Sequence, residues 1–411
     1  MIKYINKLIY RVTDRLKPML FLVLPKSLLR KAKSKISSKS AASIKAAPYK
    51  AGVFDSGVNL YGYFSMGFGL GQGVRLVSGA LKTAGIDYGT VDYGKGVLQD
   101  QPPAYNTNII HINPDRFYDA CLKLGDRFKD RYNIGFWLWE LPEIPTDWVP
   151  FLSCVHEIWT PSRFTQNAFA RSSPVPVRLM PYGIEIITEK RYGRDYFNLP
   201  ADTFLYLCMY DVSSTSMRKN PMGTIDAFKK SFPPECRDVG IVVKINCPNQ
   251  KERKKEIQQI KNALKGYSNL FIIEEHLSKT GIYSLIEVCD VFVSMHRSEG
   301  FGLVMAEAMY LGTPAIATNW SANTDFMTNE NSCPVDYKLT GITKTCNLYQ
   351  KGQLWAEPDT SHCAEYMRRL FEDRDYYNDI KSAARNYIKT ELTPAKSGTA
   401  MTARLKDIGL L

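Results

Sequence analysis

Acidic residues are almost missing from the start of the chain. Residues 1–50 contain 13 Lys and Arg but a single carboxylate, Asp14, whereas the remainder carries 40 charges of each sign. The net charge of +12 therefore belongs to this segment. Each Lys or Arg contributes about 1 kcal/mol of attraction near an anionic membrane. We expect residues 1–50 to associate with such a surface. A disordered basic tail is the alternative, and nucleic acid is not an expected partner because no nucleic-acid module follows.

A long hydrophobic run is also lacking from this segment. Its apolar patch, Met19–Leu24, is far shorter than the ~20 residues that cross a bilayer. A signal peptide fits poorly, because the apolar region is short and a Lys/Ser/Ala-rich stretch follows it. We therefore predict a cytoplasmic protein that lies peripherally on the inner face of the membrane.

The cysteines do not form a recognisable framework. There are nine, an odd number, and none has C-x-x-C spacing. Several fall in apolar runs, as Cys208 and Cys289 do. This pattern predicts reduced core residues and argues against a disulfide scaffold or a zinc site.

What the chain does contain is an alternation of β-rich and helical patterns over 411 residues, enough for two domains of ordinary size. Such an alternation predicts an α/β fold with parallel sheets. No short internal repeat is evident. The expected divisions are residues 1–50, a basic segment; 51–183, an N-terminal domain; 184–200, a linker; 201–390, a C-terminal domain; and 391–411, a C-terminal helix.

One stretch of the C-terminal domain carries the strongest chemical signal. Asp290–Ser294 reads as a buried strand, Gly300 and Gly302 break it, and a helix then runs from about Leu303 to a glycine C-cap at Gly312. A glycine turn that opens a helix binds anions well, because backbone N–H groups and the helix dipole both favour phosphate. The sequence therefore predicts a phosphate site here.

Two carboxylates, Glu299 and Glu307, bracket this turn with the spacing Glu-x7-Glu. Beside phosphate they are unfavourable unless they bind hydroxyl groups, which a sugar nucleotide would supply. The segment Ser-Glu-Gly-Phe-Gly-Leu-Val-Met-Ala-Glu resembles the donor site of glycosyltransferase family 4. That resemblance implies a retaining, nucleotide-sugar-dependent enzyme of the GT-B fold, in which two Rossmann-like domains face a central cleft and the last helix crosses back to the first domain.

The resemblance also implies roles for residues of the donor side. Glu307 would accept hydrogen bonds from ribose hydroxyls, Glu299 would hold a hydroxyl of the donor sugar, and the loop containing Glu275 would lie at the nucleobase. The remaining donor-binding groups would be the amides that cradle the diphosphate, at Phe301, Gly302 and Leu303. GT-B enzymes usually work without a metal, so neither a metal nor another cofactor is expected.

Departure of a nucleoside diphosphate requires positive charge at the leaving oxygen. Arg218 and Lys219, which are predicted to open a helix in the C-terminal domain, are the best cations for this role. The sequence departs here from the commoner family pattern, in which the arginine precedes the lysine by about five residues, because Ser214 occupies that place. Lys219 is therefore the firmer assignment of the two.

The residues of the acceptor side are harder to identify from the sequence. A glycine-rich segment after the first strand, Gly67 to Gly73, fails the G-x-G-x-x-G dinucleotide pattern in either register. It is similar to the family 4 loop that lies against the cleft, and Gly69, Gly71 and Arg75 are its candidates.

Three polar residues lie at the ends of two further predicted strands, 108–113 and 132–139, and are further acceptor-side candidates: His111, Asn113 and Glu140. Ligands gather at the carboxyl ends of parallel strands, and the place of His111 resembles a histidine on the acceptor side in family 4. A catalytic role for His111 and a structural one both remain open. Trp137 and Trp139 fit either the core or a stacking surface.

The function predicted from the sequence is transfer of a hexose from a nucleotide-diphosphate sugar to a hydroxyl of a glycan or lipid-linked acceptor, in surface-polysaccharide assembly. Catalytic roles fall to Glu299, Lys219, Arg218 and His111. The alternatives are a catalytically silent sugar-nucleotide-binding subunit of a membrane glycan complex, and a GT-B epimerase or phosphorylase.

Overall fold

The computed structural model describes residues 46–94 and 104–411. The predicted membrane-associating segment therefore lies outside the described residues, apart from its last five. The chain divides into two compact units. Unit 1 comprises the residues up to Trp139, together with 143–183 and 394–411, and unit 2 comprises 140–142 and 184–393. No described helix is both long enough and apolar enough to cross a membrane.

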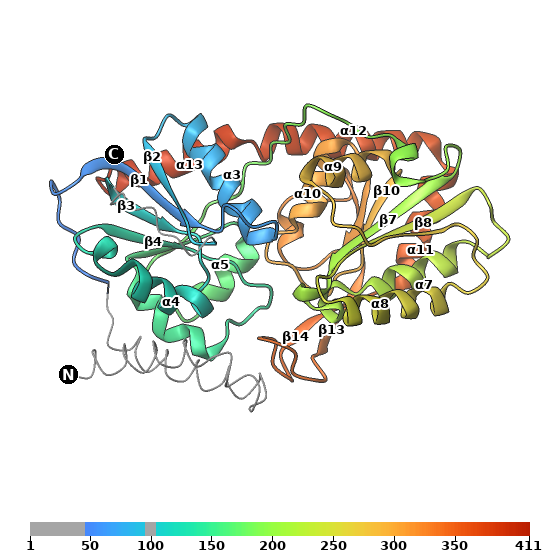
Figure 1. The fold of residues 1–411 in the computed structure, drawn as a ribbon, viewed down its shortest axis with the longest axis horizontal. Helices are drawn as coiled ribbons and strands as arrows, with labels where there is room; N and C mark the ends of the chain where they lie inside the picture. Colours follow the sequence, from blue (N-terminus) through green and yellow to red (C-terminus); the bar gives the residue numbers. More distant parts are fainter. Residues whose placement is uncertain (1–45, 95–103) are drawn as a thin grey trace. The chain divides into compact units, whose positions relative to one another are not determined.

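Unit 1 is built on a six-stranded parallel sheet in the order β2-β1-β3-β4-β5-β6. Figure 1 shows α3 and α13 on one face of this sheet and α4 and α5 on the other. The strands are β1 (Asp55–Gly62), β2 (Tyr88–Asp92), β3 (Tyr105–Ile110), β4 (Tyr132–Phe136), β5 (Glu157–Thr160) and β6 (Val177–Leu179), and the helices are α3 (Gly69–Thr83), α4 (Pro114–Leu124), α5 (Arg163–Ala170) and α13 (Pro394–Asp407).

Unit 2 holds a second six-stranded parallel sheet, in the order β12-β11-β10-β7-β8-β9. Figure 1 shows α9 and α10 on one face and α7, α8 and α11 on the other. The strands are β7 (Phe204–Asp211), β8 (Val239–Asn246), β9 (Leu270–Ile273), β10 (Val291–Ser294), β11 (Ala315–Thr318) and β12 (Cys333–Val335), and the helices are α6 (Ser216–Lys219), α7 (Pro221–Ser231), α8 (Gln250–Ala263), α9 (Lys279–Val288), α10 (Leu303–Leu311), α11 (Thr360–Glu372) and α12 (Arg374–Glu391).

Each sheet reverses its strand order once. In unit 2 the chain fills positions outward from β7 to β9 and then returns to place β10 on the other side of β7. In unit 1 the reversal falls between β1 and β3. Open α/β sheets bind ligands outside the carboxyl ends of the strands at such a reversal. The loops after β7 and β10, and those after β1 and β3, are therefore the places where functional side chains should collect.

The structure corrects several expectations. The fourth strand of unit 1, β4, ends at Phe136, so Trp137 and Trp139 lie beyond it, and both indoles are buried as core residues. After residue 331 the structure contains β12 and an antiparallel hairpin, β13 (Tyr337–Gly341) with β14 (Leu354–Pro358), which the sequence pattern does not predict. The glycine-rich loop of unit 1 is shorter than expected, because α3 already begins at Gly69.

Two further segments are held by the unit to which they belong. Residues 184–200 pack on unit 2, where the Arg194 guanidinium donates to Asp290 over 2.8 Å. The terminal helix α13 packs on α3 of unit 1, where Gly398 comes so close that a Cβ there would lie 2.5 Å from the Ala80 carbonyl oxygen. All nine cysteines are free, and six of them are buried.

Candidate functional site

The turn between β10 and α10 has the construction that the sequence indicates. Gly302 is the N-cap of α10 with φ 93°, and a Cβ there would meet the Met305 methyl carbon at 2.7 Å, so another residue would strain both backbone and packing. Gly312 closes the helix with φ 84°. The glycines therefore fix the position of α10 and of the peptide groups at Phe301, Gly302 and Leu303 that precede and open it.

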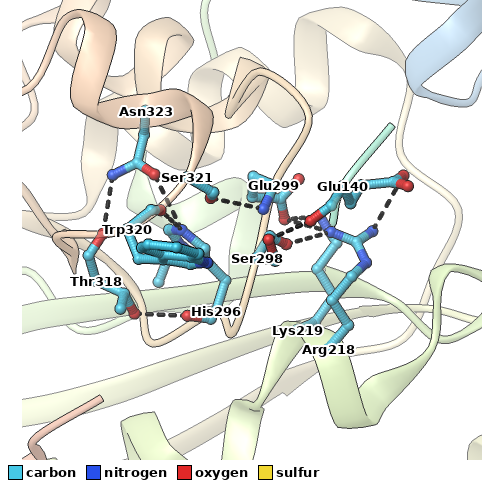
Figure 2. A network of polar contacts seen from close by, with 11 residues as sticks. Glu140, Arg218, Lys219, His296, Ser298, Glu299, Thr318, Trp320, Ser321 and Asn323 are labelled. Atoms are coloured by element: carbon cyan, nitrogen blue, oxygen red, sulfur yellow. Dashed lines mark hydrogen bonds and ion pairs between the residues drawn. The ribbon is translucent and has the colours of Figure 1, made fainter. Parts of the chain in front are cut away.

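Two cations meet on one oxygen of Glu299. The Lys219 ammonium lies 2.5 Å from Glu299 Oε1, and an Arg218 guanidinium nitrogen lies 3.1 Å from the same atom. Burial alone would raise the pKa of Glu299, but Arg218 and then Lys219 outweigh it and hold this pKa at about 2. Glu299 is therefore a carboxylate at any physiological pH, and Figure 2 shows both cations converging on it.

Arg218 and Lys219 do not open a helix as expected. They end a short helical turn, α6, and the left-handed residue Asn220 then starts α7, with its side chain accepting from the Gly223 amide. Arg218 is only 3% exposed and also donates to the Ser298 carbonyl over 2.7 Å. Because β7 leads to these cations and β10 leads to Glu299, the three groups meet across the strand reversal of unit 2.

Glu140 joins this cluster. Residues 140–142 group with unit 2, the Glu140 carboxylate lies 3.9 Å from the Arg218 guanidinium, and its carbonyl accepts a hydrogen bond from the Ser298 hydroxyl. Burial raises the pKa of Glu140, while Arg218 opposes that effect. The structure thus brings the predicted acceptor-side residue Glu140 to the cations of the predicted donor side.

The β13–β14 hairpin, which the sequence analysis missed, supports the loops that carry these groups. Arg297 pairs with Glu357 of β14 over 2.6 Å, and its backbone carbonyl accepts from the Ala356 amide over 2.9 Å. The loop of the hairpin bonds Thr215 through the Asn347 amide and brings the Tyr349 ring to 5.9 Å from the Arg218 guanidinium carbon. The local signals for this hairpin are Gly341 at the end of β13 and Gly352, with φ 90°, two residues before β14, beside the β-branched and aromatic content of the segment.

A buried histidine supports the loop that carries Glu299. His296 contacts the Ser294 hydroxyl and the Asn323 side-chain oxygen, each over 3.1 Å, and its carbonyl accepts from Thr318 over 2.6 Å. Burial lowers the pKa of His296, so the ring is neutral at pH 7. The Glu299 amide is held in turn by the Ser321 hydroxyl over 2.8 Å. Figure 2 shows the contacts of His296 beside those of the cation cluster.

Glu307 lies in the second turn of α10 and is 6% exposed. The Tyr283 hydroxyl of α9 donates to its Oε1 over 3.1 Å, and the Lys279 ammonium lies 3.1 Å from that hydroxyl. This contact orients the carboxylate that the sequence assigns to ribose. Glu275, the predicted nucleobase residue, is exposed in the loop after β9.

The histidine of unit 1 is enclosed. His111 has no exposed surface, its Nε2 lies 2.7 Å from the Tyr182 hydroxyl, and its ring stacks on Phe136 at 5.1 Å. Burial lowers its pKa to about 4. A Cβ on Gly73 of α3 would lie 2.9 Å from His111 Nε2, so the glycine lets the helix pass directly over the ring.

The other acceptor-side candidates shape the loops after β1 and β3. One Arg75 nitrogen donates to the Phe64 carbonyl over 2.7 Å and to the Met66 carbonyl over 3.1 Å, so the guanidinium holds the segment before α3. Asn113 accepts from the Leu138 amide over 2.9 Å. Gly69 and Gly71 occupy the first turn of α3. Among the described residues, no group of three or more His, Cys, Asp or Glu side chains could hold a metal ion.

Comparison with known proteins agrees with this architecture. Residues 209–387 match the family described as glycosyl transferases group 1. No curated protein matches the chain significantly in sequence.

Several solved structures share the fold at low sequence identity. HepE from Anabaena, solved in complex with UDP and glucose, has a TM-score of 0.61 at 13% identity, over 86% of this chain and 100% of that one. Sucrose-phosphate synthase from Thermosynechococcus elongatus has a TM-score of 0.62 at 15% identity, over 86% and 99%. A TarM mutant from S. aureus, in a complex that includes UDP, has a TM-score of 0.53 at 12% identity, over 73% and 55%. With its paired six-stranded sheets and the group 1 match over unit 2, the chain is a glycosyltransferase of the GT-B fold.

Proposed function

We propose that the chain is a retaining glycosyltransferase that moves a hexose from a nucleoside-diphosphate sugar to a hydroxyl of a glycan or lipid-linked acceptor. The observation that carries this proposal is the meeting of Arg218, Lys219 and Glu299 at the strand reversal of unit 2, directly before the glycine-capped start of α10. Cations and the backbone amides at the start of a helix bind a diphosphate favourably, and buried carboxylates accept hydrogen bonds from sugar hydroxyls.

The charges of the cluster indicate how a donor would bind. Glu299 pairs with both cations, and its single negative charge leaves them with a net positive charge for an anion. A diphosphate that takes over Lys219 and Arg218 would free Glu299 to accept a hydrogen bond from a hydroxyl of the donor sugar. Glu307, held by Tyr283, would bind the ribose hydroxyls. The cations then stabilise the charge that develops as the sugar–phosphate bond breaks.

The proposed step needs no protein nucleophile. The acceptor oxygen attacks the anomeric carbon from the face that the diphosphate leaves, the bond between that carbon and the phosphate oxygen breaks, and the acceptor proton passes to the leaving phosphate. This front-face course retains the anomeric configuration. It requires positive charge beside the leaving oxygen, which Lys219 and Arg218 supply.

The acceptor and the location are proposed from the charge distribution. The basic residues 1–50 favour an anionic membrane. A peripheral enzyme at the inner face of the membrane would meet lipid-linked or growing glycans, so surface-polysaccharide assembly is the proposed setting.

The test is a panel of nucleotide sugars in UDP, GDP and dTDP form, scored by thermal stabilisation of the full chain. Those that bind are then incubated with lipid-linked and glycan acceptors, and the product anomer is read by NMR. Transfer with retained configuration supports the proposal. Binding without transfer or hydrolysis favours the silent subunit, an epimerised donor favours the epimerase, and phosphate-dependent release of a sugar phosphate favours the phosphorylase.

A further inference from the structure

A buried lysine lies in unit 2 away from the Glu299 cluster. Lys244 is the sixth residue of β8 and is 2% exposed. Its neighbours in the strand, Val243 and Ile245, belong to the apolar cluster that α7, α8 and α11 cover. Because side chains alternate along a strand, Lys244 lies on the opposite face, which Figure 1 shows beneath α9 and α10.

The ammonium of Lys244 makes few hydrogen bonds for a buried charged group. Its one hydrogen bond among the described residues runs to the Ile245 carbonyl over 3.0 Å, although an ammonium has three donors. No described carboxylate lies within ion-pairing distance of it. Burial lowers the pKa of Lys244, and the negative charges of Glu275 and Asp211 oppose that effect from farther away. Buried charges are costly unless they are paired, so this ammonium is expected to have a partner that is a ligand.

The position of Lys244 indicates which part of a ligand it would meet. It lies near the carboxyl end of β8, in register with Ile273 at the end of β9, and Glu275 follows two residues later. This edge of the sheet is the ligand-binding edge of an open α/β fold. A fixed hydrogen-bond donor thus lies close to a loop that presents an acceptor.

We propose that Lys244 recognises the carbonyl oxygen of a keto nucleobase, with Glu275 accepting a hydrogen bond from the adjacent ring N–H. Uracil, thymine and guanine present a carbonyl at this position, whereas adenine and cytosine present an amino group that would set donor against donor. The inference deepens the proposed function and rests on it, since the nucleobase would belong to the nucleoside-diphosphate sugar.

The experiment measures dissociation constants of UDP, GDP, ADP and CDP by calorimetry, for the full chain and for Lys244→Met, which keeps the length and the apolar stem of the side chain. The wild type is expected to prefer UDP or GDP. Lys244→Met should weaken that nucleotide by about tenfold or more, the loss of a hydrogen bond to a charged donor, and leave ADP and CDP unchanged. Lys254→Met, at an exposed position on α8, is the matched control and should bind all four as the wild type does.

Thermal unfolding separates binding from a structural role. Removing an unpaired buried charge should leave the Tm of Lys244→Met equal to or above that of the wild type. A lowered Tm, an unchanged preference among the four nucleotides, or an equal loss for all four would each overturn the inference while the proposed function stands. A wild type that binds none of the four, and no dTDP either, would overturn the proposed function and this inference together.

Discussion

Lys219 places its ammonium 2.5 Å from Glu299 Oε1 and so joins the loop after β7 to the loop after β10. The pair is only partly enclosed, because 22% of the Lys219 side chain is exposed. An ion pair at this depth can open without exposing the core of unit 2.

Lys219→Ala should reduce kcat/KM for transfer by roughly a hundredfold to a thousandfold, the loss expected when one group that stabilises developing charge is removed. The fold should persist, since Arg218 still neutralises Glu299. Steady-state kinetics with the accepted donor measure the effect. Lys230→Ala, which breaks a surface pair with Asp226, is the control. Full activity in the Lys219 variant would refute its assignment.

Arg218 should behave differently because it is buried. Arg218→Met removes the buried guanidinium that pairs with the buried Glu299 carboxylate, and breaking a buried pair by removing one partner costs about 3–5 kcal/mol. Urea denaturation should therefore show a large loss of stability, in contrast to Lys219→Met. Equal stability of the two variants would mean that Arg218 is not the structural cation of the pair.

Tyr283→Phe should raise KM for the donor more than it lowers kcat. The substitution keeps the ring but removes the hydrogen bond to Glu307, which in the proposed function binds the ribose. A donor whose ribose lacks both hydroxyls should bind the wild type and Tyr283→Phe equally. Glu307→Gln should lose activity by orders of magnitude. If the Tyr283 effect were the same with the deoxygenated donor, the link to the ribose would be disproved.

His111 should contribute to the acid sensitivity of unit 1. Its folded-state pKa is about 4, below the ordinary 6.5, because burial disfavours the charged ring. The unfolded chain binds the proton first, so stability present above pH 6.5 is lost as the pH falls toward 4, by about 3 kcal/mol in all.

The test of this pH dependence compares unfolding free energies of the wild type and His111→Phe across that range. The variant should lose less stability on acidification. The exposed His276→Phe serves as control for replacing a histidine elsewhere. Parallel curves for the wild type and His111→Phe would show that His111 is already charged in the folded protein, or is not the group responsible.

The start of the chain offers a test of the membrane proposal. Deleting residues 1–45 should release the protein from anionic vesicles and leave donor binding intact. The cut stops at Lys45 because the Ala46 amide bonds the Ser153 carbonyl over 3.0 Å and Lys50 pairs with Asp130 over 3.1 Å. Sedimentation with anionic and neutral vesicles measures the change. Unaltered sedimentation after the deletion would contradict the proposal.

The sequence predicted best where local chemistry dictates structure. Gly302 and Gly312 bound α10 because both adopt left-handed conformations that glycine favours. The sequence did not predict the structure where packing between distant residues determines it. The four residues of α6 are too few to show a period, and Asn220 supplies a left-handed turn that usually calls for glycine.

The site shows the same division. Glu299 and Glu307 are recognisable by their spacing in the sequence, and Arg218 and Lys219 are recognisable as cations that follow a strand. Their supports, by contrast, come from distant positions: Tyr283 lies 24 residues before Glu307, and Tyr349 reaches Arg218 from a hairpin whose exposed Leu339 and Leu354 hide its alternation. Contacts of this kind are set by the folded sheet and leave no local pattern.

The β13–β14 hairpin is also closed at its base, where the Asp359 amide bonds the Asp336 carbonyl over 2.7 Å. A segment that leaves and re-enters the fold at one point can change in length or sequence without displacing β12 before it or α11 after it. Because its loop contacts the turn that carries Arg218, such changes would reach the cation pair directly. The hairpin is thus a segment in which changes of length or sequence could alter the surroundings of Arg218 while both sheets keep their strands.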